Sequence, residues 1–127
     1  DYDNVAQYKL DNYVCIAPTS VWFTKQLPRE QWVKLINKTN DKTTVYLLGG
    51  PADKDQCEQI KAASNNKNVV NLCGELSFLE SAALMQNASM NYVNDSAPLH
   101  IASAMNAPVT ALLLFDSTKI WFYSFIR

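Results

Sequence analysis

Polar side chains gather at one strand-to-helix junction, in the segment NYVNDSAPLHIASAM at residues 91–105. Ser96 is a good helix N-cap, and Pro98 suits a first helical turn. A helix that begins here offers free backbone N–H groups and a positive dipole end, which together favour an anion such as phosphate. His100, the only histidine, lies four residues after Ser96 and therefore on the same helix face. Asp95 would repel a phosphate, so we expect it to cap the helix, orient His100 or contact a hydroxyl group.

A second junction lies in APTSVWFTKQLP, residues 17–28, where hydroxyl and ammonium groups precede a predicted helix. Thr19, Ser20 and Lys25 could hold an anion there. A structural role is the alternative for both junctions. Residues 17–28 could be a solvated loop with a helix cap, and residues 91–105 could be a capped helix whose histidine is hydrogen-bonded within the fold. Neither segment pairs a nucleophile with an oriented base, so the sequence does not indicate a hydrolase.

The third junction, LLGGPADKDQ at residues 47–56, contains two adjacent glycines. Gly49 and Gly50 allow close approach of the backbone to a neighbouring group. Asp53 could cap a helix or accept a hydrogen bond from a sugar hydroxyl, and both interpretations stay open. The spacing of the glycines matches neither a P-loop nor a G-x-G-x-x-G turn.

The fourth junction is NLCGELSFLE at residues 71–80. Gly74 suggests a turn with a positive φ angle. Ser77 and Glu80 have the S-x-x-E spacing of a capping box at a helix start. Glu75 is expected to be exposed, and a structural role is favoured for this loop.

The elements that position these junctions follow from alternating patterns. Four predicted helices separate five apolar runs that have the composition of strands, and the connections are too long for hairpins. Continuous apolar runs are typical of strands that are covered on both faces. The pattern therefore predicts an α/β fold with a Rossmann-like parallel sheet and helices on both faces, whose ligands bind at the carboxyl ends of the strands. The expected strands are 13–18, 43–50, 68–74, 89–94 and 107–115, and the expected helices are 27–38, 53–64, 78–87 and 97–105.

Composition narrows the function classes. The chain has 127 residues, 48% of them apolar, which suits one globular domain. A net charge of −1 argues against a broad surface for nucleic acid or an acidic membrane. Cys15, Cys57 and Cys73 fit no zinc pattern, and two of them lie in apolar runs, so we expect buried thiols in a reducing, cytoplasmic compartment. Because the chain opens with DYDN rather than methionine, we expect a piece of a longer protein.

Together, the junctions resemble the C-terminal, donor-binding half of family 9 glycosyltransferases, the heptosyltransferases that build the lipopolysaccharide core. The resemblance runs from Tyr13 to Leu113. The segment NDSAPLHIASAMNAPVTAL is similar to the family signature, a D-[ST]-G-x-x-H turn before a small-residue helix, and Ala97 stands at its usual glycine. LLGGPADKD, VVNLCGELSFLESAALMQNA and KQLPREQWVKLI follow in the family's order and spacing.

The resemblance implies one half of a GT-B glycosyltransferase, with a site for a nucleotide-linked sugar that is typically ADP-heptose. By resemblance, the donor pyrophosphate would contact the helix start at Ser96, Ala97 and His100. Asp95 would contact the donor sugar or shape the turn. The acceptor, a lipopolysaccharide or glycolipid, would bind to the other half of the enzyme.

The same resemblance assigns roles at the other three junctions. A hydroxyl-and-lysine stretch that contacts phosphate and sugar would correspond to Thr19, Ser20 and Lys25. Asp53 lies near the position where the family places an acid on the ribose. The residues that would border the adenine are Gly74, Glu75 and Leu76.

The acceptor half, expected to supply the catalytic base, lies outside this resemblance. We therefore expect residues 1–12 to be a linker or N-terminal extension and residues 13–127 to be a donor-binding domain that does not transfer sugar alone. We expect no cofactor and no metal. The intact parent would be cytoplasmic, and a peripheral association with the inner membrane stays open.

The tail LLLFDSTKIWFYSFIR departs from the family after Leu113, so the C-terminus is expected to be truncated or altered. A reading-frame change and a divergent final strand are both compatible with it. Seven of the last thirteen residues are aromatic or isoleucine. Such a tail predicts self-association if it is exposed.

Three other functions fit the sequence less well. A signalling receiver domain is excluded because it needs an acidic pair after the first strand and an Asp after the third, whereas these strands end in IAPTS and NLCGE. A GT-B epimerase is the main alternative, although more carboxylates near the sugar would be expected. A non-catalytic interaction module that uses the aromatic tail is the third.

Overall fold

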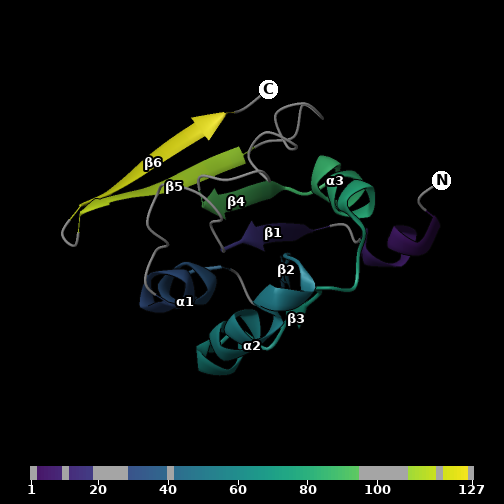
Figure 1. Cartoon of the computed structure of the whole chain (residues 1–127), viewed down its shortest axis with the longest axis horizontal. Coiled ribbons are helices and arrows are strands. Elements are labelled where there is room, and N and C mark those ends of the chain that lie inside the picture. Colours follow the sequence, from purple (N-terminus) through teal and green to yellow (C-terminus); the bar gives the residue numbers. More distant parts are fainter. Residues whose placement is uncertain are drawn as a thin grey trace.

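The computed structural model describes residues 3–9, 12–18, 29–39, 42–94, 109–116 and 119–125. Within these ranges six strands form one sheet in the order β3-β2-β1-β4-β5-β6 (Figure 1). The first five strands in this order are parallel to one another, and β6 pairs antiparallel with β5. The predicted parallel sheet is confirmed, with one antiparallel strand at its edge. The strands are β1 (Tyr13–Ala17), β2 (Thr44–Leu47), β3 (Val69–Asn71), β4 (Met90–Asn94), β5 (Val109–Asp116) and β6 (Lys119–Phe125).

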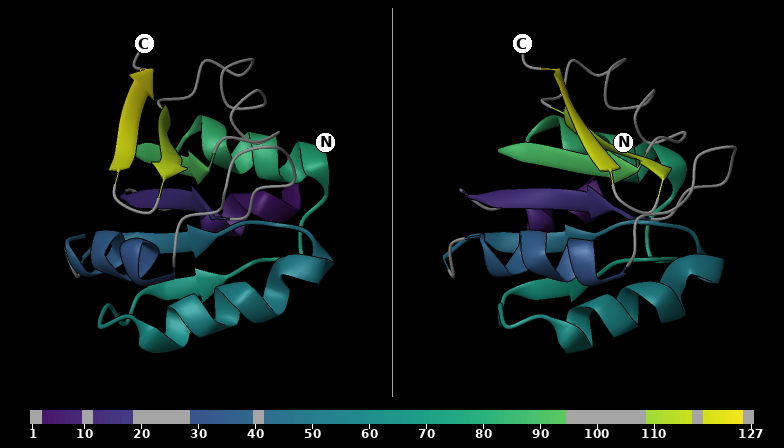
Figure 2. Two further views of the ribbon diagram at one scale, coloured as in Figure 1. Left: turned by 60° about the vertical axis from the view of Figure 1, so that its left-hand side comes forward. Right: turned by 90° about the vertical axis from the view of Figure 1, so that its left-hand side faces the viewer.

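Helices cover both faces of this sheet, as predicted (Figure 2). One face carries α1 (Arg29–Asn37) and α2 (Lys54–Ala63), which follows the short 3-10 helix η2 (Pro51–Asp53). The other face carries α3 (Phe78–Gln86) and the 3-10 helix η1 (Asp3–Tyr8). The fourth expected helix, 97–105, lies outside the described residues.

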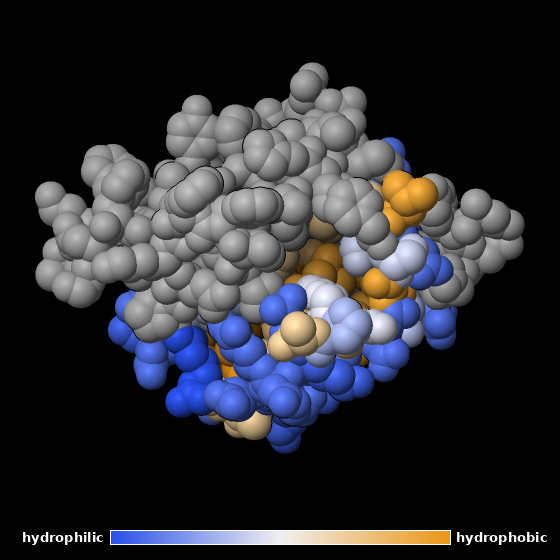
Figure 3. All heavy atoms as spheres, viewed as in Figure 1, coloured by the Kyte–Doolittle hydropathy of each residue, from blue (hydrophilic) through white to orange (hydrophobic). Residues whose placement is uncertain are grey.

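The core beneath α1 and α2 is built from apolar residues at helical and strand spacing. Trp32 and Ile36 lie one turn apart on α1 and are buried. Val14 and Ile16 alternate along β1 toward the same face. The polar side of α2 faces outward, and hydrophilic residues cover the described surface there (Figure 3). We name this cluster the α1–α2 core: Val14, Ile16, Trp32, Ile36, Val45, Leu47, Cys57, Ile60, Val69 and Cys73.

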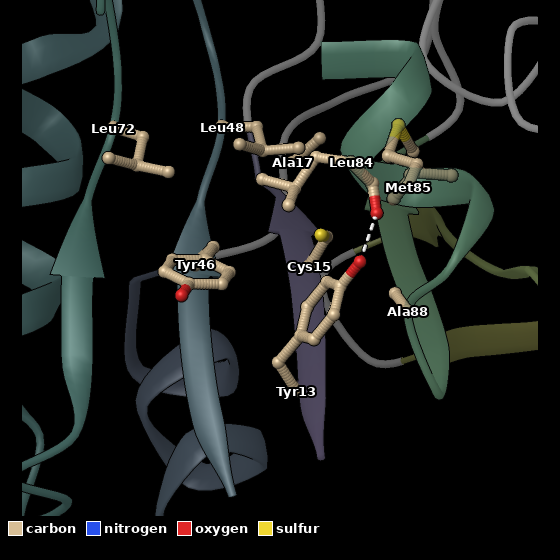
Figure 4. Packing of buried hydrophobic residues seen from close by; sticks show 10 residues of the cluster. Tyr13, Cys15, Ala17, Tyr46, Leu48, Leu72, Leu84, Met85 and Ala88 are labelled. Carbon is tan, nitrogen blue, oxygen red and sulfur yellow. Dashed lines mark hydrogen bonds between the residues drawn. The ribbon is translucent and has the colours of Figure 1, made fainter. Parts of the chain in front are cut away.

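The core beneath α3 is richer in polar atoms (Figure 4). The hydroxyl of Tyr13 donates to the carbonyl of Leu84 at 2.7 Å. Tyr46 makes edge-to-face ring contacts with Tyr13 at 5.5 Å and with Tyr8 of η1 at 5.6 Å. We name this cluster the α3 core: Tyr13, Cys15, Ala17, Tyr46, Leu48, Leu72, Leu84, Met85, Ala88 and Val93.

Local signals of the sequence fix the start of α3. The Ser77 hydroxyl accepts a hydrogen bond from the Glu80 N–H at 3.2 Å, and the Glu80 carboxylate accepts one from the Ser77 N–H at 2.7 Å. The predicted capping box is therefore confirmed. Across the described ranges, the helices all fall short of the length and apolar character that crossing a bilayer requires.

Candidate functional site

The winding direction of the sheet changes between β1 and β4. The chain first winds outward through β1, β2 and β3, and β4 then pairs with the opposite side of β1. Open α/β sheets bind ligands in the crevice at the carboxyl ends of such a strand pair. The segments that follow β1 and β4, residues 19–28 and 95–108, lie outside the described residues. They contain the predicted site residues Thr19, Ser20, Lys25, Asp95, Ser96, Ala97 and His100.

The loops that follow β2 and β3 are described, and they dock on each other. The Leu72 N–H donates to the Leu47 carbonyl at 2.9 Å, which continues the pairing of the strands past their ends. The Gly74 N–H then donates to the Gly49 carbonyl at 2.9 Å. Two of the four predicted junctions thus form one continuous edge.

Gly74 has the positive φ angle that the sequence predicted, at 78°. A Cβ atom at this position would lie 3.0 Å from the Cα of Pro51 in the neighbouring loop. Both the backbone angle and the close approach therefore require glycine. A Cβ atom at Gly49 would lie 3.0 Å from the Asp53 carboxylate, so that glycine is also needed for packing.

Asp53 acts as a cap in this structure. Its Oδ2 atom accepts a hydrogen bond from the Gly50 N–H at 3.0 Å and closes the start of η2. The side chain therefore caps η2 but makes no capping hydrogen bond to α2, the helix that the sequence expected it to cap, and the contact with a sugar hydroxyl stays a prediction. The half-buried carboxylate stands at the same edge as Gly74.

Glu75 is exposed, as expected, and pairs with Lys54 at an Nζ–Oε1 distance of 3.5 Å. The two side chains are 53% and 54% exposed, so solvent screens the pair and its contribution to stability is small. Leu76 is half-buried against the α3 core. The three residues predicted to border the adenine thus provide a turn at Gly74, a carboxylate at Glu75 and an apolar side chain at Leu76.

Sequence reasoning missed Asn71, the last residue of β3. Its side-chain N–H₂ group donates to the Lys54 carbonyl and to the Glu58 carboxylate, both at 3.1 Å. Its Oδ1 atom accepts from the Cys73 N–H at 3.1 Å and fixes the turn before Gly74. An amide residue at the carboxyl end of a strand, three residues before a glycine, was the available signal.

The three cysteines are free and buried, which confirms the prediction for the thiols. Burial raises the pKa of the Cys15 thiol and keeps it protonated. In the described ranges, no three His, Cys, Asp or Glu side chains come together to hold a metal ion. The groups that the described part of this edge offers to a ligand are backbone hydrogen-bonding groups, the Asp53 carboxylate and the Lys54–Glu75 ion pair.

Comparison with known proteins identifies the family. The profile of glycosyltransferase family 9 (heptosyltransferase) matches residues 2–122. Lipopolysaccharide heptosyltransferase 3 of Escherichia coli K12 is 32% identical over 114 residues, which cover 87% of this chain and 33% of that relative. The chain therefore spans about a third of the length of the curated relatives that it matches.

Solved structures agree with this match. The ADP-heptose lipopolysaccharide heptosyltransferase II of E. coli superposes with a TM-score of 0.77 and 25% identity, over 86% of this chain and 35% of that one. A family 9 glycosyl transferase from Veillonella parvula DSM 2008 shares the fold, with a TM-score of 0.73, 19% identity and coverage of 86% and 33%. By its sequence match over 2–122 and its identity to a curated heptosyltransferase, the chain belongs to glycosyltransferase family 9.

Proposed function

We propose that this chain is the donor-binding half of a GT-B glycosyltransferase that transfers a heptose, or a related sugar, from a nucleotide-sugar to a lipopolysaccharide or glycolipid acceptor. The observation that carries the proposal is the family match over 2–122, joined to the 0.77 TM-score with an enzyme described as an ADP-heptose heptosyltransferase. ADP-heptose is therefore the proposed donor.

The proposed phosphate contacts come from the sequence of the junctions after β1 and β4. The helix start at Ser96 and Ala97, with His100, would hold the donor diphosphate, and Lys25 would add a positive charge. Thr19 and Ser20 would offer hydroxyl groups to phosphate and sugar, and Asp95 would meet the sugar or shape the turn: these seven residues form the proposed phosphate and sugar side of the site.

The proposed nucleoside contacts come from the docked loops after β2 and β3. Gly74, Glu75 and Leu76 would border the adenine, and Asp53 would accept a ribose hydroxyl through Oδ1, since Oδ2 already accepts from the Gly50 N–H. The hydrogen bond between Gly74 and Gly49 supports a single surface, because it joins the two loops.

The proposed mechanism uses fixed donors rather than a nucleophile of this half. Negative charge grows on the diphosphate as the anomeric bond of the sugar breaks. N–H groups of the expected helix start and the Lys25 ammonium would stabilise that charge if they are fixed around it before the reaction. A base of the acceptor half would deprotonate the acceptor hydroxyl. The chain alone would bind donor and leave it intact.

Self-association is a second proposal, carried by the place of β6 in the sheet. β6 is the outermost strand of the described sheet and pairs on one side with β5. Its sequence, KIWFYSF, has one charge and no proline, so it lacks most of the features that protect an edge strand. We further propose a cytoplasmic protein, in line with three buried cysteines that form no disulfide with one another.

An NMR titration of the ¹⁵N-labelled chain tests the donor site. Adding ADP should shift the backbone amides of Gly49, Gly50 and Gly74, at the carboxyl edge. Those of Tyr13 and Thr44, at the opposite edge, should stay in place and serve as the internal control. UDP in a parallel titration should produce much smaller shifts. Equal or larger shifts with UDP would favour the epimerase-like alternative, and shifts confined to the opposite edge would refute the proposed site.

A further inference from the structure

The side chain of Asn71 joins the end of β3 to helix α2, which lies along this strand (Figure 2). Its N–H₂ group donates to two acceptors on α2, the Lys54 carbonyl and the Glu58 carboxylate, both at 3.1 Å. Lys54 and Glu58 are four residues apart and therefore lie on the same side of the helix. One amide group thus holds the end of β3 against the first turns of α2.

The oxygen of the same side chain fixes the loop that follows β3. The Asn71 Oδ1 atom accepts a hydrogen bond from the Cys73 N–H at 3.1 Å, two residues further along the chain. Asparagine favours this geometry, because its side chain can take the place of a backbone turn. The Glu75 N–H then donates to the Leu72 carbonyl at 3.0 Å and closes the turn that contains Gly74. The position of this turn relative to α2 is therefore set through Asn71.

Both sides of this connection carry proposed nucleoside contacts. On the side of α2, Lys54 directly follows Asp53, the proposed acceptor for a ribose hydroxyl. On the other side, the turn leads into Glu75 and Leu76, which are proposed to border the adenine. The ion pair between Lys54 and Glu75 also links the two sides, but solvent screens it at 3.5 Å. The shorter hydrogen bonds of Asn71 add the directional part of the link.

We propose that Asn71 is a positioning residue for nucleoside recognition, which sets the distance between the Asp53 carboxylate and the loop at Glu75 and Leu76. A nucleoside spans a nearly fixed distance from its ribose hydroxyls to its base. A loop that is already held at the matching distance binds it without a further cost of ordering. Asn71 acts through these residues and does not itself contact the ligand. The inference rests on the proposed donor function and specifies its nucleoside side.

An exchange of donors and acceptors tests this role. Asn71→Asp keeps an acceptor for the Cys73 N–H, but it places carboxylate oxygens against the Lys54 carbonyl and the Glu58 carboxylate. Calorimetric titration of the full chain with ADP should show an affinity lowered about two- to tenfold. Adding Glu58→Gln supplies an amide donor from α2 and should recover most of the affinity. Glu58→Gln alone keeps an acceptor for Asn71 and gives the baseline for this recovery.

The ¹⁵N spectrum of the chain without ligand gives a second readout. The amide signals of Gly74 and Glu75 should move in Asn71→Asp and return toward their original positions when Glu58→Gln is added. Should Asn71→Asp fail to fold, Asn71→Ser takes its place, because a hydroxyl can still accept from the Cys73 N–H but is too short to reach both acceptors on α2. That variant should weaken ADP binding without recovery by Glu58→Gln.

Asn66 offers a matched control at the other end of β3. Its Oδ1 atom accepts a hydrogen bond from the Asn68 N–H at 2.8 Å, again two residues further along. Asn66→Ala should lower the thermal midpoint and leave the affinity for ADP unchanged. If the unmutated chain binds ADP and Asn71→Asp binds it equally well, or Asn66→Ala loses as much affinity, the inference is overturned and the donor proposal stands. A folded, unmutated chain that does not bind ADP would refute the donor proposal and this inference with it.

Discussion

The two faces of the sheet are held in different ways. The α1–α2 core is filled by aliphatic side chains, Trp32 and two buried cysteines, and close packing of these side chains holds it together. On the other face, the Tyr13 hydroxyl of the α3 core donates to the Leu84 carbonyl at 2.7 Å. The side-chain amide of Asn91, a buried polar residue of β4, donates to the Met85 carbonyl at 2.9 Å. Carbonyls in the last turn of a helix lack intrahelical partners, so the polar groups of the sheet satisfy them.

The difference shows how a short helix can be fixed in orientation. Helix α3 has only nine residues and is apolar over much of its surface, so hydrophobic burial alone would not define its rotation. Directional bonds to its last turn do so, while the capping box fixes its start. The amphipathic helices α1 and α2 need no such bonds, because only one side of each is apolar.

The largest loss of stability is expected from a large-to-small substitution in the α1–α2 core. Ile36→Ala removes a fully buried side chain and leaves a cavity, which should lower the free energy of unfolding by about 2–5 kcal/mol. Urea denaturation followed by circular dichroism measures the change. A loss below about 1 kcal/mol would mean that this face does not depend on tight packing.

A smaller loss is expected from removing one directional bond of the α3 core. Tyr13→Phe keeps the ring and deletes the hydroxyl, so the Leu84 carbonyl loses a buried donor. The expected loss is about 1–3 kcal/mol in the same denaturation experiment. Tyr46→Phe is the matched control, because its ring packs in the same cluster and its hydroxyl makes no hydrogen bond to another described residue. Equal losses for both variants would argue against the role given to the Tyr13 bond.

The turn at Gly74 carries the chain from one face to the other, and we expect it to be sensitive to a side chain. Gly74→Ala forces alanine into a positive φ angle and toward Pro51, at a cost of about 1–2 kcal/mol. Gly50→Ala should be close to neutral, because Gly50 has an extended backbone and a Cβ there would lie 3.8 Å from Asp53. Similar thermal midpoints for the two variants would contradict this reading of the turn.

The Tyr13 hydroxyl of the α3 core makes stability depend on pH only in alkaline solution. Burial, and then the nearby Cys15 and Tyr46, raise the pKa of Tyr13 above its ordinary value. The unfolded chain therefore loses the phenol proton first, so stability is complete below a pH of about 10 and falls as the pH rises further. Denaturation at pH about 9 and about 11 measures the fall, which should shrink in Tyr13→Phe. An unchanged fall would show that other groups cause it.

Local patterns predicted the parts of the fold and of the edge that depend on neighbouring residues. The capping box at Ser77 and the positive φ at Gly74 need only a few residues of sequence, and both are confirmed. Whether Asp53 caps a helix was open, because its hydrogen bond to Gly50 and a contact to a sugar require the same residue type.

Other features depend on strand order and could not be read from the sequence. The three hydrogen bonds of Asn71 and the docking of Gly74 on Gly49 exist because the sheet places β3 beside β2. The antiparallel pairing of β6 was covered only by the general alternative of a divergent final strand.

Calorimetry of nucleotide binding tests the proposed donor function most directly. The chain is titrated with ADP, ADP-heptose, UDP and GDP, and the series is repeated with His100→Ala. We predict selective binding of the adenine nucleotides, weakened in the variant, because the histidine is proposed to contact the diphosphate. A chain that circular dichroism shows to be folded and that binds none of the four, or binds them all alike, would contradict the account.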